Sequence, residues 1–439
     1  MIPLSSIYKR KIKTLQDVID WGLCIGCGAC FYACRKKAVT LVNVESVGIR
    51  PMLNHHLCGE CTECVSICPG YQTDTSSMPR ESDLPSPEED EIGYTLEIRE
   101  GYASAPETRY RASSGGLLSA LSLYCLEQEG MSFVLHIGMN PERPWENTTF
   151  QSRTREEILQ KTGSRYAPAS PCDGLEAIEK SDTPCVFIGK PCDVAGVSMA
   201  RRQRSQLDKN LGLVLSFFCA GTPSTQGTLK VLEALNTRKG DLKQLRYRGN
   251  GWPGHFTPVK RDGSVPGTYT YEESWNRLNQ FRDFRCHLCP DGLGRMADLS
   301  CGDSWHEYAN NGTPGSSIIL VRTPRGREIL HRAMAAGYVT LKPLAASEVI
   351  RAQTSLLSRR RVLFGRLLAM RMLGIPIPRF TGFALLRSWM RIPLRERFRS
   401  IAGTLHRLIQ RGRWHRRPLC EQRKSQSEQT ENLLKEQES

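Results

Sequence analysis

The stretch C-I-G-C-G-A-C-F-Y-A-C from Cys24 to Cys34 decides how the N-terminal part of this chain is interpreted. A second stretch, C-G-E-C-T-E-C-V-S-I-C from Cys58 to Cys68, repeats its spacing of two, two and three residues between cysteines, and Pro69 follows it. Three cysteines at steps of three fit a tight loop that wraps one face of a metal-sulfur group, and the fourth begins a helix. The repeat therefore predicts two such groups in one segment.

This spacing is typical of bacterial ferredoxin-type segments with two 4Fe-4S clusters, in which the fourth cysteine of each run ligates the other cluster. The predicted ligands are Cys24, Cys27, Cys30 and Cys68 for one cluster, and Cys58, Cys61, Cys64 and Cys34 for the second. A structural zinc site is the alternative, but zinc takes its four ligands in two pairs and leaves the triple spacing unexplained. Two clusters are therefore the better interpretation.

The composition of the whole chain favours a globular protein of the cytoplasm. Its 439 residues, 39% of them hydrophobic, suffice for two or three packed domains. We find no apolar run of about 18 residues and no export signal, so we expect neither secretion nor a membrane span. In a reducing compartment the 17 cysteines then indicate metal rather than disulfides.

Composition also divides the chain into parts. Residues 1–75 form the two-cluster segment, and the polar, acidic and proline-bearing residues 76–97 are typical of a linker. From 98 to 345, β-branched runs alternate with helical patterns, which indicates an α/β domain with a partly parallel sheet. Its expected strands include 132–137, 184–188, 211–218 and 317–321, and its expected helices include 117–129 and 227–236. No strands are expected in the Arg-rich helical extension 346–419, and residues 420–439 are expected to be disordered.

Polar, glycine-rich turns follow predicted strands or precede predicted helices in the central domain. They are R-A-S-S-G-G at 111–116, T-G-S-R-Y at 162–166, G-K-P-C-D at 189–193, Y-R-G-N-G-W-P-G at 247–254 and G-D-S-W at 302–305. Each offers backbone amides to a phosphate, although any one of them alone is equally well an ordinary turn. None has the Rossmann or Walker spacing.

In this order, and together with the cysteine runs, the turns make residues from about 20 to 345 resemble the family of coenzyme F420 hydrogenase and dehydrogenase beta subunits. That family binds FAD in an α/β domain and passes electrons between the flavin and iron-sulfur clusters. The resemblance implies an α+β ferredoxin-like two-cluster domain, an α/β flavin-binding domain and, beyond the resemblance, a basic helical C-terminal tail.

The resemblance further implies that two of the turns approach the phosphates and ring of FAD, and that a lysine and a third turn lie near the isoalloxazine. The residues are Ser113, Ser114, Gly115 and Gly116, then Gly163, Ser164, Arg165 and Tyr166, and finally Lys190 with Asn250, Gly251 and Trp252. A fixed cation such as Lys190 would stabilise an anionic reduced flavin. An ordinary surface lysine is the alternative.

Four further cysteines are candidates for a third 4Fe-4S cluster beside the flavin on the same resemblance. They are Cys192, Cys219, Cys286 and Cys289. Cys286 and Cys289 are separated by two residues, and Cys192 and Cys219 each follow a predicted strand. In the alternative, Cys192 and Cys219 are buried small hydrophobic residues and the loop pair holds nothing permanently.

The net charge of +15 comes from the C-terminal extension, where 17 arginines between Arg351 and Arg417 face one acidic residue, Glu396. From about 383 to 414, leucines and other apolar residues alternate with arginines in an amphipathic pattern. Such a helix lies on an anionic membrane surface, packs on the enzyme or a partner subunit, or exposes a solvated face. Nucleic-acid binding is not expected, because no motif for it accompanies the charge.

The leading hypothesis is an iron-sulfur flavoprotein oxidoreductase that moves electrons between its clusters and FAD, with hydride exchange to coenzyme F420 or another organic substrate. A flavin is required because each cluster carries one electron and a hydride carries two. One alternative is a non-catalytic electron-transfer subunit of a larger complex. Another is a ferredoxin-dependent reductase of a membrane-associated intermediate, for example in polysaccharide assembly. No catalytic acid or base can be named from the sequence.

Overall fold

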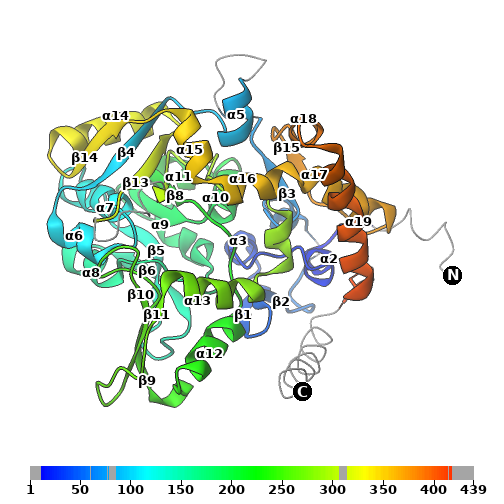
Figure 1. Ribbon diagram of the computed structural model, residues 1–439, viewed down its shortest axis with the longest axis horizontal. Coiled ribbons are helices and arrows are strands. Elements are labelled where there is room, and N and C mark those ends of the chain that lie inside the picture. Colours follow the sequence, from blue (N-terminus) through cyan, green and yellow to red (C-terminus); the bar gives the residue numbers. More distant parts are fainter. Residues whose placement is uncertain are drawn as a thin grey trace.

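An eight-stranded sheet in the order β14-β4-β13-β12-β8-β7-β5-β6 occupies the centre of the molecule (Figure 1). The computed structural model describes residues 11–59, 61–76, 78, 86–305, 314–413 and 415–417. The strands are β4 (Glu97–Ala103), β5 (Val134–Met139), β6 (Asn147–Ser152), β7 (Cys185–Gly189), β8 (Leu211–Phe217), β12 (Leu299–Asp303), β13 (Ser317–Val321) and β14 (Val339–Pro343). β12, β8, β7 and β5 run parallel, and the other pairs are antiparallel. The expected α/β architecture with a partly parallel sheet is confirmed.

The parallel strands are nearly continuous apolar runs because both faces of the sheet are covered. One face packs on α7 (Leu117–Glu127), α8 (Arg155–Lys161) and α14 (Pro324–Ala335). The other face packs on α9 (Leu175–Glu179) and α10 (Pro191–Arg201), with α11 (Ser205–Asn210) beside them. Side chains alternate between the two cores, as Val134 and Leu135 do.

The expected elements of the central domain are present, with shifts of a few residues at their ends. The expected strand 132–137 is β5, which begins at Val134, and the expected helix 117–129 is α7, which ends at Glu127. The expected helix 227–236 is α12 (Thr225–Ala234). Helix and strand ends are set by local hydrogen bonds, which hydropathy patterns do not resolve.

A small subdomain projects from the lower side of the sheet in Figure 1. It contains β9 (Leu242–Arg246), β10 (His255–Lys260), β11 (Tyr269–Thr270), α12 and α13 (Tyr271–Leu278). Its core includes Leu245, Tyr247 and Phe256. The subdomain begins after the C-terminal end of β8, and an antiparallel β-bridge between Pro223 and Arg282 joins its beginning to its end.

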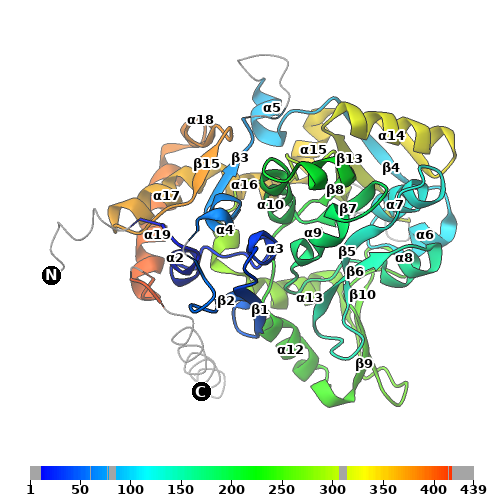
Figure 2. The ribbon, with the colours of Figure 1, turned by 180° about the vertical axis from the view of Figure 1, so that it is seen from behind.

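The N-terminal segment contains α2 (Leu15–Asp20), α3 (Ala29–Ala33), the hairpin of β1 (Val39–Val44) and β2 (Gly48–Leu53), α4 (Glu63–Ser66) and β3 (Gln72–Asp74). Figure 2 shows α3 beside α9 and α10. Cys27, Tyr32 and Ile67 accordingly belong to the core on that face of the sheet. The two-cluster segment is thus packed on the α/β domain and is not a separate lobe.

Residues of the expected linker also form structure where they are described. α5 (Pro87–Ile92) is capped by Ser86, whose hydroxyl accepts from the Glu89 amide while the Glu89 side chain accepts from the Ser86 amide. Ile92 is buried with Leu293 and Val349. The acidic composition that suggested a linker belongs to the first turn of a capped helix, where carboxylates are stabilised.

The C-terminal extension forms α15 (Ala346–Ala352), α16 (Thr354–Arg361), α17 (Leu363–Met372), β15 (Arg379–Thr381), α18 (Leu385–Met390) and α19 (Leu394–Gln410). The expectation that it contains no strand is wrong, because β15 pairs in parallel with β3. A strand of three residues is too short to show a period in the sequence. The expected disordered tail 420–439 lies outside the described residues.

These helices pack on the N-terminal segment as well as on the α/β domain. Leu363, Leu367 and Leu408 share a core with Cys24 and Cys68, whereas α15 and α16 contribute to a core under β13. The N-terminal segment is therefore enclosed between the sheet and the C-terminal helices. None of the helices in the described part of the chain is both long and apolar enough to span a bilayer.

Candidate functional site

The eight N-terminal cysteines form two groups that differ in burial. Cys24, Cys27, Cys30 and Cys68 are buried; Cys34, Cys58 and Cys64 are partly exposed, and Cys61 is exposed. Burial raises the pKa of the Cys30 thiol well above its usual value, and repulsion from Cys24, Cys27 and Cys68 adds to the increase. Cys68 therefore lies among the cysteines of the first run.

The second group contains the last cysteine of the first run. Partial burial raises the pKa of Cys64 to about 11, and Cys61, Cys34 and Cys58 contribute by repulsion. Backbone amides also reach sulfurs in both groups: the Gly26 amide lies 3.4 Å from Cys24 Sγ, and the Ala38 amide lies 3.2 Å from Cys34 Sγ. Such amides stabilise negative charge on sulfur.

Cys172, which has no spacing partner in the sequence, lies against the buried group. Its amide donates to the Cys27 carbonyl at 3.0 Å, and a hydrogen bond between the two side chains lowers the pKa of Cys27. Ser170 supports the same contact, because its Oγ donates to the Gly26 carbonyl at 2.8 Å. The loop before α9 therefore joins the first cysteine run to the central domain.

A third group of cysteines comes from three separate junctions of the fold. Cys192 is the second residue of α10, Cys219 follows β8, and Cys286 and Cys289 lie in and after the short 3-10 helix η4 (Phe284–Leu288). All four line one small cavity of about 40 Å³. Burial raises the pKa of Cys286 to about 12, with contributions from Asp283, Cys219 and Cys289. The structure thus brings together the four cysteines that the sequence left far apart.

No three His, Cys, Asp or Glu side chains among the described residues converge as ligands of a single metal ion do. A 4Fe-4S cluster needs a wider ring of thiols, because its irons and sulfides separate the cysteines that ligate it. Near the third group, the Thr222 amide lies 3.3 Å from Cys286 Sγ. The Arg359 guanidinium donates to the Cys219 carbonyl at 2.9 Å. These groups supply positive potential around the thiols, as an anionic cluster requires.

A buried ion pair separates the third group from the first. Arg50 donates to Asp283, and both line the four-cysteine cavity. The Cys286 amide donates to the Asp283 carbonyl at 3.0 Å. Asp283, Cys24 and Cys286 all stabilise the charged form of Arg50 and raise its pKa although burial lowers it. Arg50 is therefore a cation shared by the surroundings of two cysteine groups.

A larger cavity of about 340 Å³ lies beside the C-terminal ends of the parallel strands. Ligand sites in α/β folds occur at this edge of the sheet. Eight of the residues expected near a flavin line it: Ser113, Ser114, Gly116, Gly163, Ser164, Arg165, Tyr166 and Lys190. Gly115 lies next to the wall, where its amide donates to Ser317 Oγ at 2.9 Å. The two glycine-rich turns that are far apart in sequence are therefore adjacent.

Tight backbone contacts explain the glycines in these turns. A Cβ on Gly115 would lie 2.5 Å from the Gly101 carbonyl oxygen, and Gly163 has a φ of +121°. The Ser164 amide donates to Ser113 Oγ at 2.5 Å, which joins the two turns directly. Gly116 is the N-cap residue of α7 and has no side chain that could accept a hydrogen bond. It therefore leaves the first amides of the helix without a side-chain cap.

Asn250, Gly251 and Trp252 do not line the large cavity. The Gly251 amide donates to the Tyr110 carbonyl at 2.9 Å, and Trp252 Nε1 donates to Asp303 Oδ1 at 3.3 Å. This turn stands one layer behind the wall, where it supports Asp303. Its expected position near a flavin ring came from the resemblance and stays a prediction.

Arg165 lines the large cavity and also holds neighbouring strands together. Its Nε donates to Asn147 Oδ1 at 2.5 Å, and its other nitrogens donate to the carbonyls of Leu245 and Pro144 at 2.8 and 2.7 Å. Burial lowers its pKa to about 10. The guanidinium therefore braces β6 against β9.

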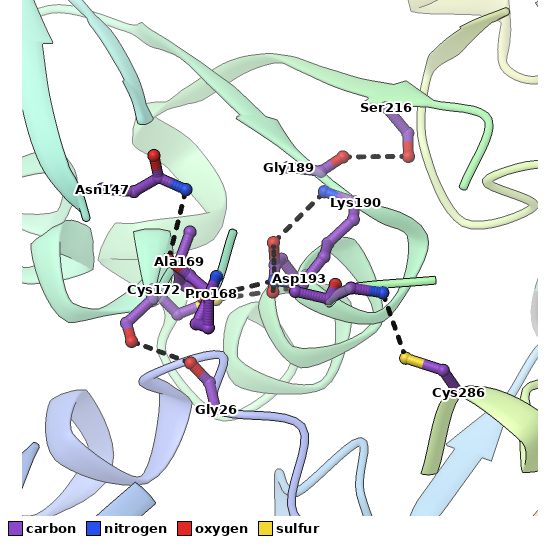
Figure 3. A network of polar contacts seen from close by, with 12 residues as sticks. Gly26, Asn147, Pro168, Ala169, Cys172, Gly189, Lys190, Asp193, Ser216 and Cys286 are labelled. Carbon is purple, nitrogen blue, oxygen red and sulfur yellow. Dashed lines mark hydrogen bonds and ion pairs between the residues drawn. The ribbon is translucent and has the colours of Figure 1, made fainter. Parts of the chain in front are cut away.

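Lys190 is the N-cap residue of α10 and lines both cavities. Its Nζ lies 2.6 and 2.8 Å from the carboxylate oxygens of Asp193 and 3.3 Å from the Ala169 carbonyl (Figure 3). Asp193 raises the pKa of the lysine although burial lowers it. The ammonium is therefore charged, and the Asp193 carboxylate neutralises it. The sequence argument did not include this carboxylate.

Sequence reasoning missed an ion pair and an aromatic wall in the large cavity. Arg248 is buried, and its guanidinium donates to both oxygens of Asp303 at 2.7 and 3.0 Å. Besides Tyr166, which the resemblance had named, the aromatic side chains that line the cavity are Phe217, Phe218, Tyr271, Trp275 and Trp305. The Tyr271 and Trp305 rings are stacked with centroids 5.2 Å apart. The sequence did contain one signal for this wall: Tyr271 and Trp275 are four residues apart on one helix and therefore lie on the same face of it.

Two further wall residues come from unexpected places. Gln353, which precedes α16, donates from Nε2 to the Asp303 carbonyl at 2.7 Å, so the C-terminal extension completes the cavity. His136 on β5 lines the wall beside Ser152, with 2.8 Å between Nε2 and Oγ. Burial lowers the pKa of His136 to about 4, so the imidazole is neutral near pH 7.

Comparison with known proteins gives a consistent set of matches. Residues 98–176 and 183–347 match the N-terminal and C-terminal family models of coenzyme F420 hydrogenase/dehydrogenase, beta subunit. Residues 23–71 match a 4Fe-4S dicluster domain.

Individual relatives are distant in sequence. The chain is 26% identical over 244 residues to the beta subunit of a coenzyme F420 hydrogenase of Methanosarcina barkeri, covering 53% of this chain and 77% of that protein. It is 22% identical over 325 residues to a subunit of the F(420)H(2) dehydrogenase of Methanosarcina mazei, covering 72% and 83%. It is 22% identical over 336 residues to a coenzyme F420-dependent sulfite reductase of Methanocaldococcus jannaschii, covering 72% and 46%.

Among solved structures, a chain of the F420-reducing [NiFe] hydrogenase complex from Methanosarcina barkeri has a TM-score of 0.47 and 22% identity, covering 63% of this chain and 95% of that chain.

Proposed function

Because the chain belongs to the family of coenzyme F420 hydrogenase/dehydrogenase beta subunits and carries a 4Fe-4S dicluster domain, we propose that it transfers electrons between its clusters and FAD in the large cavity. The partner for hydride exchange in this proposal is coenzyme F420 or another organic substrate. The chain is an iron-sulfur protein of an oxidoreductase family. FAD, the third cluster and the substrate are the proposed parts.

One observation carries the proposal: the four-cysteine cavity and the large cavity have a common wall. Lys190, Cys219, Gly221 and Thr222 line both of them. A redox group among the four cysteines would thus be next to any cofactor in the large cavity. Asp193 raises and Lys190 lowers the pKa of Cys27, so the buried N-terminal group is close to the same wall.

The residues of the large cavity fit a dinucleotide. The two joined glycine-serine turns offer amides and hydroxyls at one side, and the aromatic wall offers flat apolar surface at another. The volume of about 340 Å³ is in the range of cofactor sites. A flavin would supply the conversion between one-electron and two-electron transfer.

The residues of the chain have distinct roles in this proposal. The turns at 113–116 and 163–164 bind the phosphates, and Tyr271, Trp275 and Trp305 exclude water from the reacting ring. The neutralised Lys190–Asp193 pair offers a hydrogen-bond donor without excess positive charge. Arg248 holds Asp303 and the carbonyl of Ser113 in place.

The order of burial suggests a route for electrons. The group with exposed Cys61 is accessible to an external carrier, and the group of Cys24, Cys27, Cys30 and Cys68 lies between it and the sheet. The third group lies beside the large cavity. We therefore propose a sequence from the partly exposed cluster to the buried cluster, then to a third cluster, and finally to the cavity.

The test begins with the full chain purified without oxygen and analysed for iron, sulfide and released FAD. About twelve irons per chain with one FAD support three clusters, and about eight support only the N-terminal pair. Stopped-flow bleaching of the flavin by reduced coenzyme F420, and separately by reduced ferredoxin, identifies the electron partner. A chain without flavin would overturn the proposal.

Two outcomes distinguish the alternatives. Bleaching by ferredoxin alone would indicate a ferredoxin-dependent reductase of another substrate. Flavin reduction without turnover until a second protein is added would indicate an electron-transfer subunit of a larger complex, and two of the relatives are themselves named as subunits.

A further inference from the structure

The C-terminal helices expose an unusual share of the large apolar side chains. Eleven such side chains are exposed in the described part of the chain, and six of them lie between residues 372 and 409. They are Met372, Leu386, Met390, Leu394, Phe398 and Ile409. Phe398 is 72% exposed and Leu394 is 66% exposed, the two largest values among the eleven.

The folded chain does not need these side chains for its own core. α19 already buries Ser400, Thr404 and Leu408, and it packs on α17. Leu394 and Phe398 stand four residues apart and therefore share another face of α19. Leu386 and Met390 have the same spacing on α18. The two helices thus have one face for packing and a second apolar face toward solvent.

Hydrogen bonds fix α18 relative to α19. Arg397 on α19 donates from Nε to the Ile392 carbonyl at 2.9 Å and from Nη2 to the Met390 carbonyl. Trp389 Nε1 donates to Ser400 Oγ at 3.1 Å. The four apolar side chains, which we call the α18–α19 face, are Leu386, Met390, Leu394 and Phe398.

Arginines outnumber acidic residues around this face, and the acidic helix α5 reaches it through Asp90. Arg395 and Arg399 directly follow Leu394 and Phe398 and are exposed. Arg387 and Arg391 are 42% and 43% exposed and also pair with Asp90 at 3.4 and 3.0 Å. From 362 to 417, Glu396 is the one acidic residue in the sequence. Apolar side chains next to a sector of arginines match the two requirements of a helix that lies on anionic lipid.

The position of the face in the molecule is compatible with such contact. Figure 1 shows α18 and α19 at the end opposite α14 and β14. A flat bilayer that contacts α18 and α19 at this end would not meet the central sheet.

We propose that the α18–α19 face docks on an anionic lipid bilayer, with Leu386, Met390, Leu394 and Phe398 among the acyl chains and Arg395 and Arg399 at the headgroup phosphates. The docking is peripheral, because one face of two helices enters the interface while the other remains packed on the protein. It requires no bound cofactor, and its failure would leave the proposed electron transfer untouched.

The experiment measures binding of the full-length chain to vesicles of phosphatidylcholine alone and to vesicles with equal amounts of phosphatidylcholine and phosphatidylglycerol. We expect binding to the anionic vesicles at least tenfold tighter and weakened by salt. Each arginine at such a surface accounts for roughly fivefold in affinity, so R395Q/R399Q should lose about 25-fold. L394S/F398S should lose binding as well.

Three controls make the result specific. V265S removes an exposed apolar side chain from another part of the chain and should bind like the wild type. R395K/R399K keeps both positive charges and should also bind the anionic vesicles. If the arginines instead made bidentate hydrogen bonds to a protein partner, lysines could not replace them. Circular dichroism and iron content show whether each variant is folded.

Equal binding to both kinds of vesicle, or none, would overturn the proposal. So would a wild-type chain that is dimeric by light scattering and becomes monomeric in L394S/F398S, because a second copy would then cover the face. In all of these cases the iron and flavin analysis is unaffected, so the two proposals fail separately.

Discussion

The eight cysteines of the N-terminal segment and the four of the central domain provide the same thiol chemistry in two different ways. The eight lie within residues 24–68 at a repeated spacing, and short loops bring them together. The four lie at 192, 219, 286 and 289 and meet only because β7, β8 and η4 end at one place. Local spacing brings together the two N-terminal groups of cysteines, and the topology of the sheet brings together the third group.

The two regions also differ in what surrounds the thiols. The N-terminal segment varies from buried Cys30 to exposed Cys61, whereas the four cysteines of the third group are all partly exposed and line a small cavity beside arginines and a helix start. Exposure at Cys61 suits exchange with a separate carrier, and a position beside the large cavity suits transfer to a cofactor within the same chain. The following experiments test this division, beginning with the largest expected effect.

Paired cysteine substitutions test the crossed grouping of the N-terminal segment. Cys24→Ser/Cys68→Ser should lose about four irons, because both residues belong to one proposed cluster. Cys34→Ser/Cys68→Ser should lose about eight, because it damages both clusters. Iron and sulfide analysis after anaerobic purification measures the difference. Equal loss in the two double variants would contradict the crossed grouping.

Substitution of Cys219, which lines both cavities, tests the third site. Cys219→Ser should lose about four irons and slow flavin reduction by ferredoxin about a hundredfold, while the two N-terminal clusters keep their electron paramagnetic resonance signals. Cys125→Ala is the matched control, because Cys125 is buried in the core beside α14 and away from both cavities. An unchanged iron content in Cys219→Ser would remove the third cluster from the proposed route of electrons.

Arg50 tests whether the two regions are electrically coupled. Its removal takes a buried cation from the surroundings of both Cys24 and Cys286, so reduced clusters are less stabilised. Arg50→Met should lower the midpoint potentials of the buried and third clusters by about 60 mV each, a tenfold change for one electron. Redox titration monitored by electron paramagnetic resonance measures both.

A stability control accompanies that titration. Arg50→Met alone leaves Asp283 buried without its partner and should destabilise the fold by about 3–5 kcal/mol. Arg50→Met/Asp283→Asn should recover part of the lost stability, but it should not restore the midpoint potentials of the clusters to their wild-type values. If the double variant restores both, the arginine acts through structure alone.

The smallest expected effect concerns His136 on the far wall of the large cavity. Its folded pKa of about 4 lies below the usual 6.5, so its contribution to stability is present above pH 6.5 and decreases as the pH falls toward 4. At pH 5.5 the loss is roughly 1.4 kcal/mol. Urea unfolding at pH 7 and 5.5 should show this difference in the wild type but not in His136→Gln. The same pH dependence in both proteins would refute the assignment.

Much of the fold followed from local patterns. The apolar runs at 185–189, 211–217 and 317–321 are strands, and the turn before Leu117 begins a helix. Patterns failed where an element depends on a distant partner. β15 has three residues and exists through pairing with β3, about 300 positions away. The acidic stretch that resembled a linker includes a capped helix whose last residue enters a core.

The candidate site divides in the same way. The glycine-serine turns were visible in the sequence as turns that offer amides to a phosphate, and the resemblance to the family named them and Lys190 as flavin residues. The Asp193 partner of Lys190, the Arg248–Asp303 pair and the wall residue Gln353 could not be named from the sequence, because each contact joins chemically ordinary residues through the fold.

The sequence by itself determined the two N-terminal cysteine runs and the alternation of helices and strands, since each depends on neighbours within a few tens of residues, and it determined the family through the order of motifs along the chain. Only the tertiary structure decided which cysteines are buried, how the four cysteines that the resemblance had named come to line one cavity, and which apolar side chains of α18 and α19 remain outside the core. Those outcomes depend on how surfaces from distant segments cover one another, and burial is a property of the packed molecule that no single segment contains.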